Sequence, residues 1–321
     1  MRRTLPIAAL AISLLLVGCS RDGQAPGGAA APNASDSAKA GSDAAPSAAL
    51  RIVTTNAPIA FFAQRIGGDF VTVSMSGPDD GDPAFWSPKA EDITAMQSAD
   101  LILLNGAGFE KWRSRVALPE RKVVETAEGF RSTWIETKDG ETHSHGLEGE
   151  HTHAGTAFTT WLDPMQAIEQ AKAIRARLAE ALPAQASVID ANYQALERDL
   201  RDIDARLESA VGTSHGLPLL FSHPIYDYLI RRFELNGRSV QWEPEAMPSD
   251  EEFARLAETL KEHPAKWMVW EDEPGSAIRT KLRELGVECV VVNPGSNMGT
   301  DWSGWLELQL ANTQEFARVF E

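Results

Sequence analysis

Cysteine is scarce in this sequence, which contains two cysteines in 321 residues. The first, Cys19, directly follows an apolar stretch and completes the lipobox pattern "LLVGC", so we expect it to become the N-terminus and to carry lipid. The second, Cys289, lies in the hydrophobic run "VECVVVNP" and has no partner for a structural disulfide. We therefore expect Cys289 to be a buried small apolar residue.

A hydrophobic run long enough to span a membrane is also missing. The N-terminal apolar run, residues 5–17, follows a positively charged start and is shorter than a spanning helix requires. Residues 1–19 are therefore predicted to be a lipoprotein signal peptide, with an uncleaved anchor or an ordinary signal peptide as alternatives. Residues 20–49 contain no aromatic residue and are predicted to be a disordered tether. These features predict a protein anchored through Cys19 at the periplasmic face of a bacterial membrane.

Positively charged residues are fewer than negatively charged ones: the sequence has 30 Lys and Arg against 46 Asp and Glu, which gives a net charge of −16. This balance argues against nucleic acid as a partner. The sequence also lacks a phosphate-binding glycine loop, a G-x-S-x-G elbow and an H-E-x-x-H motif. Asp272 and Glu273 could form an acid pair, but charges at a strand-to-helix turn are usually solvated or capping. We therefore expect no enzymatic activity.

The part of the chain that remains alternates predicted strands with helices. Residues 50–182 and residues 212–321 each read as a small α/β lobe with a mostly parallel sheet, in which binding loops follow the carboxyl ends of the strands. Residues 183–211 read as one long connecting helix. Apolar residues recur along it at spacings of three and four: Ile189, Tyr193, Leu196, Leu200, Ile203, Leu207 and Val211. A ligand is expected in the cleft between the lobes.

Capping residues predict where some helices begin. Ser87 and Pro88 predict a helix that ends near Ser98, and Asp163 predicts a helix that starts at the following proline. Ser249 and Glu252 have the spacing of a capping box.

Four of the seven histidines lie in the loop 141–155: His143, His145, His151 and His153. Histidines two residues apart cannot share a helical face, but in an extended or loop conformation they can converge on an ion. Neutral imidazole suits zinc, copper or nickel, and the neighbouring glutamates could add oxygen ligands. This composition favours a mobile metal-collecting loop over a solvated polar loop that contains histidines by chance.

Among the other histidines, His223 in "LLFSHPIYDY" is the strongest candidate for a ligand. It ends a predicted buried strand on the edge that should face the cleft, so it is either a metal ligand or a structural histidine with a satisfied ring. His215 and His263 are expected at the surface or in capping roles.

Nearly the whole mature chain resembles the metal-binding solute receptors of zinc and manganese ABC importers, the cluster A-I type. The resemblance is carried by "VTTNAPIAFFAQRIGGDFVTV", by "GDPAFWSPKAEDITAMQSADLILLNGAGFEKW", by the histidine-rich insertion before "WLDP", by the long helix and by "SHPIYDYLIRRFELN". It implies two α/β lobes joined by a rigid helix, with a cation held between them, and an ABC permease as partner.

The resemblance also implies four ligand positions, and this sequence departs from three of them. Ala84 and Thr159 stand where the family usually has histidines, and Asn293 stands at the position of the acidic ligand. His223 matches the third histidine of the family. The side chains of Ala84, Thr159 and Asn293 therefore cannot hold zinc in the family's manner.

Two hypotheses follow from these departures. In the first, the histidines of loop 141–155 fold over the cleft and join His223 and Glu271, while Phe85 and Trp86 form a wall. In the second, the cleft has lost its ion and takes another ligand, and the loop gathers metal at the surface. We favour the first, because a buried imidazole without a partner is costly.

The sequence thus predicts a monomeric extracytoplasmic receptor that passes a divalent transition metal to an ABC permease. Zinc is the expected ion, with Mn²⁺ or another divalent transition metal as the alternative. Binding should weaken below about pH 6, because imidazole must be neutral to bind metal. The competing prediction is a periplasmic metal chaperone or buffer that works without a permease.

Overall fold

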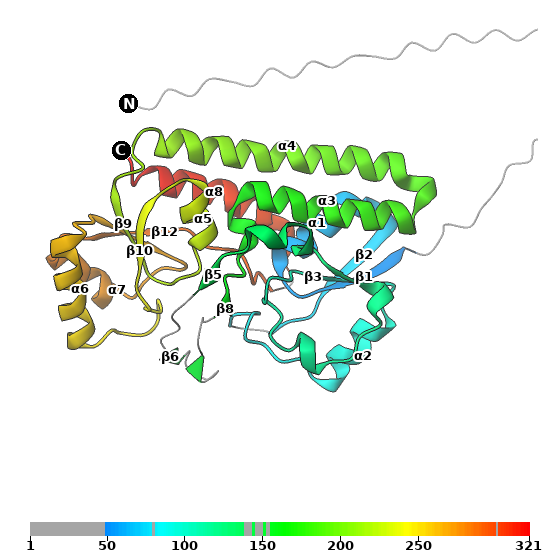
Figure 1. Cartoon of the computed structure of the whole chain (residues 1–321), viewed down its shortest axis with the longest axis horizontal. Helices are drawn as coiled ribbons and strands as arrows, with labels where there is room; N and C mark the ends of the chain where they lie inside the picture. Colours follow the sequence, from blue (N-terminus) through cyan, green and yellow to red (C-terminus); the bar gives the residue numbers. More distant parts are fainter. Residues whose placement is uncertain (1–48, 79–80, 138–142, 145–149, 152–154, 300) are drawn as a thin grey trace, which may run out of the picture. The chain divides into compact units, whose positions relative to one another are not determined.

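Two four-stranded sheets organise the folded part of the chain, and all of their strands run parallel (Figure 1). The computed structural model describes residues 49–78, 81–137, 143–144, 150–151, 155–299 and 301–321. Each sheet with its helices forms one α/β lobe, which confirms the predicted fold class. The limits predicted for the lobes stay predictions, because residues 47–321 form one compact unit.

The N-terminal lobe is built on a sheet with the strand order β2-β1-β3-β4. Its main elements are β1 (Leu50–Thr54), α1 (Ala57–Gly67), β2 (Val71–Met75), α2 (Ala90–Ser98), β3 (Leu101–Leu104) and β4 (Val123–Glu125). β3 reads "LILL" and is buried throughout, as expected of a central strand in a parallel sheet covered on both faces.

Short elements connect the main strands and helices of the N-terminal lobe. β5 (Glu136–Thr137) pairs antiparallel with β8 (Gly155–Thr156), and between them β6 (His143–Ser144) pairs with β7 (Glu150–His151). The 3-10 helices η1 (Gly68–Phe70), η2 (Arg113–Arg115), η3 (Glu120–Lys122), η4 (Glu128–Thr133) and η6 (Thr160–Leu162) complete the connections.

The C-terminal lobe repeats the arrangement with the strand order β10-β9-β11-β12. Its elements are β9 (Pro218–Phe221), α5 (Asp227–Arg232), β10 (Asn236–Ser239), α6 (Asp250–Glu262), β11 (Trp267–Trp270), α7 (Ser276–Glu284), β12 (Glu288–Val291), η8 (Trp302–Gly304) and α8 (Trp305–Ala317). The predicted capping box is present, since Ser249 Oγ accepts from the Glu252 N–H and Glu252 Oε2 accepts from the Ser249 N–H.

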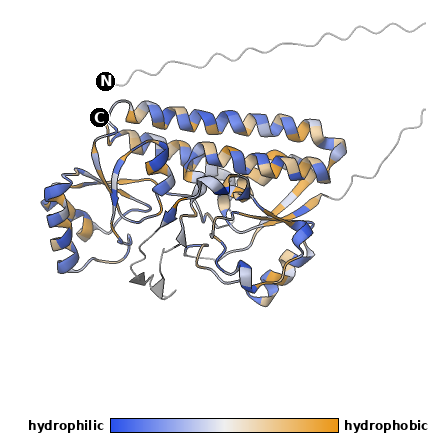
Figure 2. Ribbon diagram, in the orientation of Figure 1, coloured by the Kyte–Doolittle hydropathy of each residue, from blue (hydrophilic) through white to orange (hydrophobic). Residues whose placement is uncertain are grey.

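Two helices connect the lobes. α3 (Pro164–Ala181) starts after Asp163, whose carboxylate accepts from the Met165 N–H at 2.9 Å, as predicted. α4 (Ala186–Val211) follows the 3-10 turn η7 (Pro183–Gln185) and lies along α3 and α8 (Figure 1). Polar and apolar residues alternate along α4 (Figure 2). The apolar side chains are buried: Ile189, Leu196, Leu200, Ile203, Leu207 and Val211.

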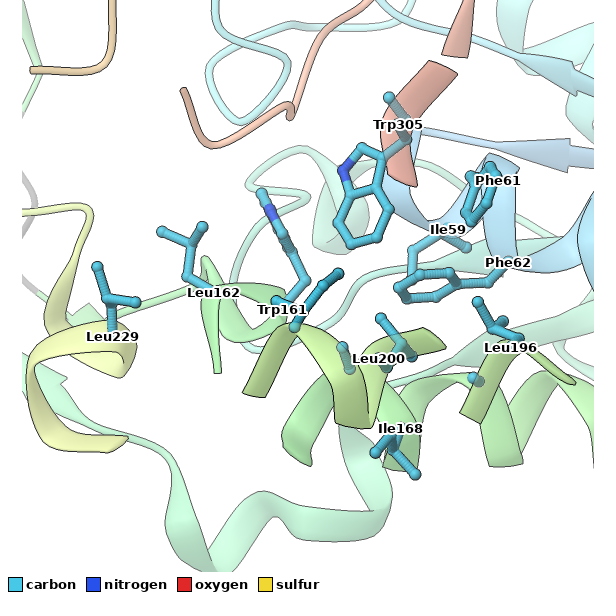
Figure 3. Packing of buried hydrophobic residues seen from close by; sticks show 14 of the residues in the cluster. Ile59, Phe61, Phe62, Trp161, Leu162, Ile168, Leu196, Leu200, Leu229 and Trp305 are labelled. Carbon is cyan, nitrogen blue, oxygen red and sulfur yellow. The ribbon is translucent and has the colours of Figure 1, made fainter. Parts of the chain in front are cut away.

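One hydrophobic cluster extends through both lobes and the connecting helices. Figure 3 shows its centre, where Trp305 from α8 packs on Phe62 from α1 with ring centroids 5.1 Å apart. Leu196 and Leu200 from α4 line the other side of this centre. A shared core of this kind resists relative movement of the lobes, because close packing must be broken to separate them.

One local prediction needs correction. The second helix begins at Ala90 instead of at Pro88, because the Asp92 carboxylate accepts from the Lys89 N–H at 2.7 Å and caps the helix there. Among the described residues, no helix combines the length and the apolar character needed to cross a membrane.

Candidate metal centre

Three neighbouring strands of the C-terminal lobe end at the same edge of the sheet, and each is followed there by one side chain of a type that can bind metal. His223 follows β9 by two residues, Glu243 follows β10, and Glu271 directly follows β11. Parallel strands end at a common edge, so side chains that are far apart in sequence meet there. The peptide N–H of Trp242 donates to the Ser222 carbonyl at 2.8 Å, which extends the β9–β10 pairing as far as the residue before Glu243.

The three side chains are close enough to share one ion. His223 Nδ1 lies 2.9 Å from Glu243 Oε1 and 3.8 Å from Glu271 Oε1. One ligand atom from each residue lies within 4.8 Å of the others. His223 is 2 % exposed, so its ring is fixed in the interior of the protein. An imidazole nitrogen and two carboxylate oxygens are a donor set that zinc and other divalent transition metals accept.

The charges around this cluster favour a cation. Burial raises the pKa of the Glu271 carboxyl well above its usual range, and the charges of Glu243, Asp82 and Glu245 raise it further. Each of these effects disfavours a second or third negative charge in a poorly solvated place. A bound divalent cation would offset that repulsion, so the cluster is electrostatically suited to hold one. Among the residues that the structure describes, this is the one group of three such ligands.

Two of these three side chains were named from the sequence as candidate ligands, and Glu243 was not. His223 was named because it ends a predicted buried strand, and Glu271 was named with it in the first of the two hypotheses for the cleft. Glu243 stands in "SVQWEPE", four residues after the end of β10, which reads "NGRS" and is polar and largely exposed. A signal was nevertheless present, because an acidic residue that follows a strand at the same edge as His223 belongs to the candidate set.

The positions that hold ligands in the resembled family are used differently here. Ala84 is fully buried and offers no side-chain donor. The Thr159 hydroxyl donates to the Ile225 carbonyl at 2.5 Å, and Asn293 Oδ1 accepts from the Gly295 N–H at 2.8 Å. Thr159 and Asn293 therefore serve contacts within the protein. That either lines the cleft for a ligand stays a prediction.

The two aromatic residues predicted to wall the cleft have different surroundings. The ring of Phe85 packs edge-on against Phe158, and the Lys111 ammonium lies 3.7 Å from its centroid. Trp86 packs edge-on against Trp112, in a hydrophobic cluster inside the N-terminal lobe. Their role as a wall stays a prediction.

The structure describes part of the histidine-rich loop. His143 in β6 stands opposite His151 in the paired strand β7. His145 and His153 lie outside the described residues, as does Cys19. That the loop histidines join His223 on one ion stays a prediction.

The rings of His215 and His263 lie next to main-chain carbonyls, and Cys289 is buried. His263 directly follows α6 and is buried, with Nε2 2.9 Å from the Leu219 carbonyl. The expected surface position is therefore wrong, whereas the expected capping position is confirmed. His215 Nδ1 lies 2.9 Å from the Phe233 carbonyl. Cys289 is a buried free cysteine, as predicted.

Hydrogen bonds connect the two lobes. Trp161 Nε1 donates to the Pro294 carbonyl at 2.8 Å, and the Tyr228 hydroxyl donates to the Ala157 carbonyl at 2.9 Å. The Ala57 N–H donates to the Ser296 carbonyl at 3.0 Å. These bonds and the shared core hold the strand ends of the C-terminal lobe at a fixed place against the N-terminal lobe.

Comparison with known proteins agrees with the sequence motifs. The family described as "Zinc-uptake complex component A periplasmic" matches residues 52–319. The zinc-binding lipoprotein AdcA of Streptococcus pneumoniae (strain ATCC BAA-255 / R6) is 25 % identical over 252 residues, which are 76 % of this chain and 50 % of AdcA. The high-affinity zinc uptake system protein ZnuA of Bacillus subtilis (strain 168) is 26 % identical over 256 residues, which are 76 % of this chain and 78 % of ZnuA. The chain spans about half the length of its streptococcal relatives.

Solved structures share the fold. The Zn(II)-bound ZnuA-like domain of Streptococcus pneumoniae AdcA superposes with a TM-score of 0.70 at 20 % identity and covers 85 % of this chain and 99 % of that domain. FpvC of Pseudomonas aeruginosa, in complex with Mn²⁺, gives a TM-score of 0.67 at 24 % identity over 84 % of this chain and 98 % of FpvC. At these identities the likeness is one of architecture, two parallel-sheet lobes with a long helix.

Proposed function

Because the chain belongs to the periplasmic zinc-uptake complex component A family, we propose that it captures zinc outside the cytoplasm and passes it to an ABC permease. The membership confirms the resemblance to metal-binding solute receptors that the sequence motifs indicated. Zinc is cargo in this function, and the protein binds and releases it without changing it chemically.

The observation that carries the proposal is the convergence of His223, Glu243 and Glu271 at one sheet edge. Their position at the carboxyl ends of parallel strands is where α/β proteins usually bind ligands. The ligands that the family usually has at the positions of Ala84, Thr159 and Asn293 are absent here. We therefore assign this cluster as the site that replaces them. Mn²⁺ and similar divalent ions are secondary cargo, because two of the three donors are oxygen atoms.

The histidine-rich loop supports capture in this proposal. His143, His145, His151 and His153 raise the local number of metal-binding groups and deliver zinc to the cluster that contains His223. The streptococcal relative is named a lipoprotein, and on this basis we place Cys19 as a lipid anchor at the periplasmic face of a bacterial membrane. The receptor works as a monomer in contact with its permease.

A competitive zinc titration of the detergent-solubilised full chain tests the proposal, with His223→Ala as the variant. His215→Gln is the matched control, because His215 lies before β9, at the opposite end of the strand from His223. Wild type and the control should bind one zinc ion tightly, whereas His223→Ala should bind it at least about tenfold more weakly. Equal titration of all three proteins would exclude the cluster as the capture site.

A further inference from the structure

The short turn that carries His223 is held from both lobes. At its start, the Ser222 N–H donates to a carbonyl of β11 at 2.8 Å, which continues the pairing of β9 with β11. At its end, the Ile225 carbonyl accepts from the hydroxyl of Thr159, in the N-terminal lobe, at 2.5 Å. His223 lies between these two contacts. The backbone on both sides of the imidazole is therefore fixed, and one of the two contacts comes from the other lobe.

Thr159 is itself fixed by the framework of the N-terminal lobe. The carbonyl of the preceding residue, Phe158, accepts from Nδ2 of Asn105, which directly follows β3, at 2.9 Å. The hydroxyl of the following residue, Thr160, donates to Oε1 of Gln170 in α3 at 3.1 Å. Asn105 and Gln170 are both fully buried. The Thr159 hydroxyl therefore connects a strand end and a helix of one lobe to the turn that carries His223 in the other.

The bond between Thr159 and Ile225 lies in the interior of the protein. Thr159 is 4 % exposed, Ile225 is 6 % exposed, and His223 between the two contacts is also buried. A carbonyl that loses its donor in such a place is not compensated by bulk water, and the turn can recover a partner only by moving. Such a movement would shift the His223 ring relative to Glu243 Oε1, which lies 2.9 Å from its Nδ1. Metal sites are sensitive to shifts of this kind, because ligand distances must be kept within about 0.2 Å.

We propose that Thr159 is a positioning residue for the metal centre. Its hydroxyl holds the turn at Ile225, and the turn keeps a ring nitrogen of His223 in place for the ion that His223 shares with Glu243 and Glu271. Thr159 does not bind the metal in this arrangement. The N-terminal lobe thereby contributes to metal affinity through a hydrogen bond, from a position where the family usually has a histidine ligand. This inference rests on the proposed function.

The test compares Thr159→Val with Thr159→Ser in the detergent-solubilised full chain, by competitive zinc titration. Valine has nearly the shape of threonine but cannot donate, whereas serine keeps the hydroxyl and loses a methyl group. Thr159→Val should weaken zinc binding at least about tenfold, as the loss of bonds that orient a metal ligand typically does. Thr159→Ser should stay within about threefold of wild type, because it keeps the donor.

Tyr228→Phe is the matched control for the loss of a contact between the lobes. The Tyr228 hydroxyl donates to the Ala157 carbonyl of the N-terminal lobe at 2.9 Å, but Tyr228 lies in α5, beyond the turn that carries His223. Thermal unfolding without metal should show a lower melting temperature for both Thr159→Val and Tyr228→Phe, since each removes a buried hydroxyl that bonds a carbonyl across the lobes. Tyr228→Phe should nevertheless bind zinc within about threefold of wild type, because the turn keeps its contacts.

The thermal unfolding also checks that each variant is folded. If the valine variant does not fold, Thr159→Ala serves the same comparison, because alanine lacks the hydroxyl and adds no bulk.

The outcomes distinguish this inference from the function on which it rests. If wild type binds zinc tightly and Thr159→Val binds it equally well, Thr159 does not position His223, although the receptor function stands. If Thr159→Val and Tyr228→Phe weaken zinc binding equally, the cause is a general loosening between the lobes, and the inference is wrong. It is also wrong if Thr159→Ser binds as weakly as Thr159→Val. If wild type binds no zinc, the proposed function and this inference fail together.

Discussion

His223 and Glu243 lie 20 residues apart in the sequence, yet His223 Nδ1 is 2.9 Å from Glu243 Oε1. They meet because β9 and β10 are parallel neighbours and both chains leave the sheet at the same edge. The pair joins a buried imidazole to a carboxylate that can share its ion.

Glu243→Gln should weaken zinc binding at least about tenfold, because an amide oxygen is a neutral and poorer ligand than a carboxylate. Zinc titration of the variant measures the loss. Glu284→Gln is a suitable control, since Glu284 is an exposed residue at the end of α7. If Glu243→Gln bound zinc as wild type does, Glu243 would merely orient the ring of His223.

Replacing the four loop histidines at positions 143, 145, 151 and 153 by asparagine should slow zinc capture and lower affinity in part. The cluster at His223 remains in this variant, so a single weaker site should persist. Stopped-flow zinc uptake and equilibrium titration measure the two effects. Complete loss of binding would instead support a metal buffer whose working part is the loop 141–155.

Asp227→Asn should stabilise the metal-free protein at neutral pH. Burial raises the pKa of Asp227 to about 6, above its ordinary value of 3.8. The folded state therefore holds the proton more tightly than the unfolded state, and stability falls as pH rises from about 4 to about 6. Asparagine cannot ionise, so its gain should be present above pH 6 and absent below pH 4.

We expect this gain to be about 1 kcal/mol, because Asp227 is partly exposed and lies in the first turn of α5, where a negative charge is favourable. Urea unfolding at pH 4 and pH 7.5 measures it. A gain of equal size at both pH values would show that ionisation of Asp227 is not its cause.

Leu200→Ala should lower the free energy of unfolding by about 2–4 kcal/mol, because Leu200 is 1 % exposed in the core beneath α4 and its removal leaves a cavity. Gln194→Ala, on the exposed face of the same helix, should change stability by less than about 0.5 kcal/mol. Urea unfolding compares the two. Equal effects would contradict the assignment of the apolar stripe to the shared core.

Local patterns in the sequence predicted much of this fold. The apolar stripe predicted α4 because a helix repeats its face every three to four residues, and Asp163 predicted the start of α3 because its side chain caps the helix. The start of α2 was missed, since Asp92 competes with Ser87 as the capping residue. His223 was named as a candidate ligand because it ends a predicted buried strand.

The composition of the cluster depends on contacts that no local pattern records. Glu243 joins His223 only through the pairing of β10 with β9. The uses of Thr159 and Asn293 are likewise set by partners elsewhere, the Ile225 carbonyl and the Gly295 N–H. Sheet order and lobe packing must be known before such residues can be brought together.

The most direct test of the metal centre is the anomalous scattering of crystals of the full chain grown with zinc, measured on both sides of the zinc absorption edge. We predict one strong anomalous peak within about 2.0–2.2 Å of a His223 ring nitrogen and of carboxylate oxygens from Glu243 and Glu271. A peak bound only by residues of the loop 141–155, with none at His223, would contradict the account.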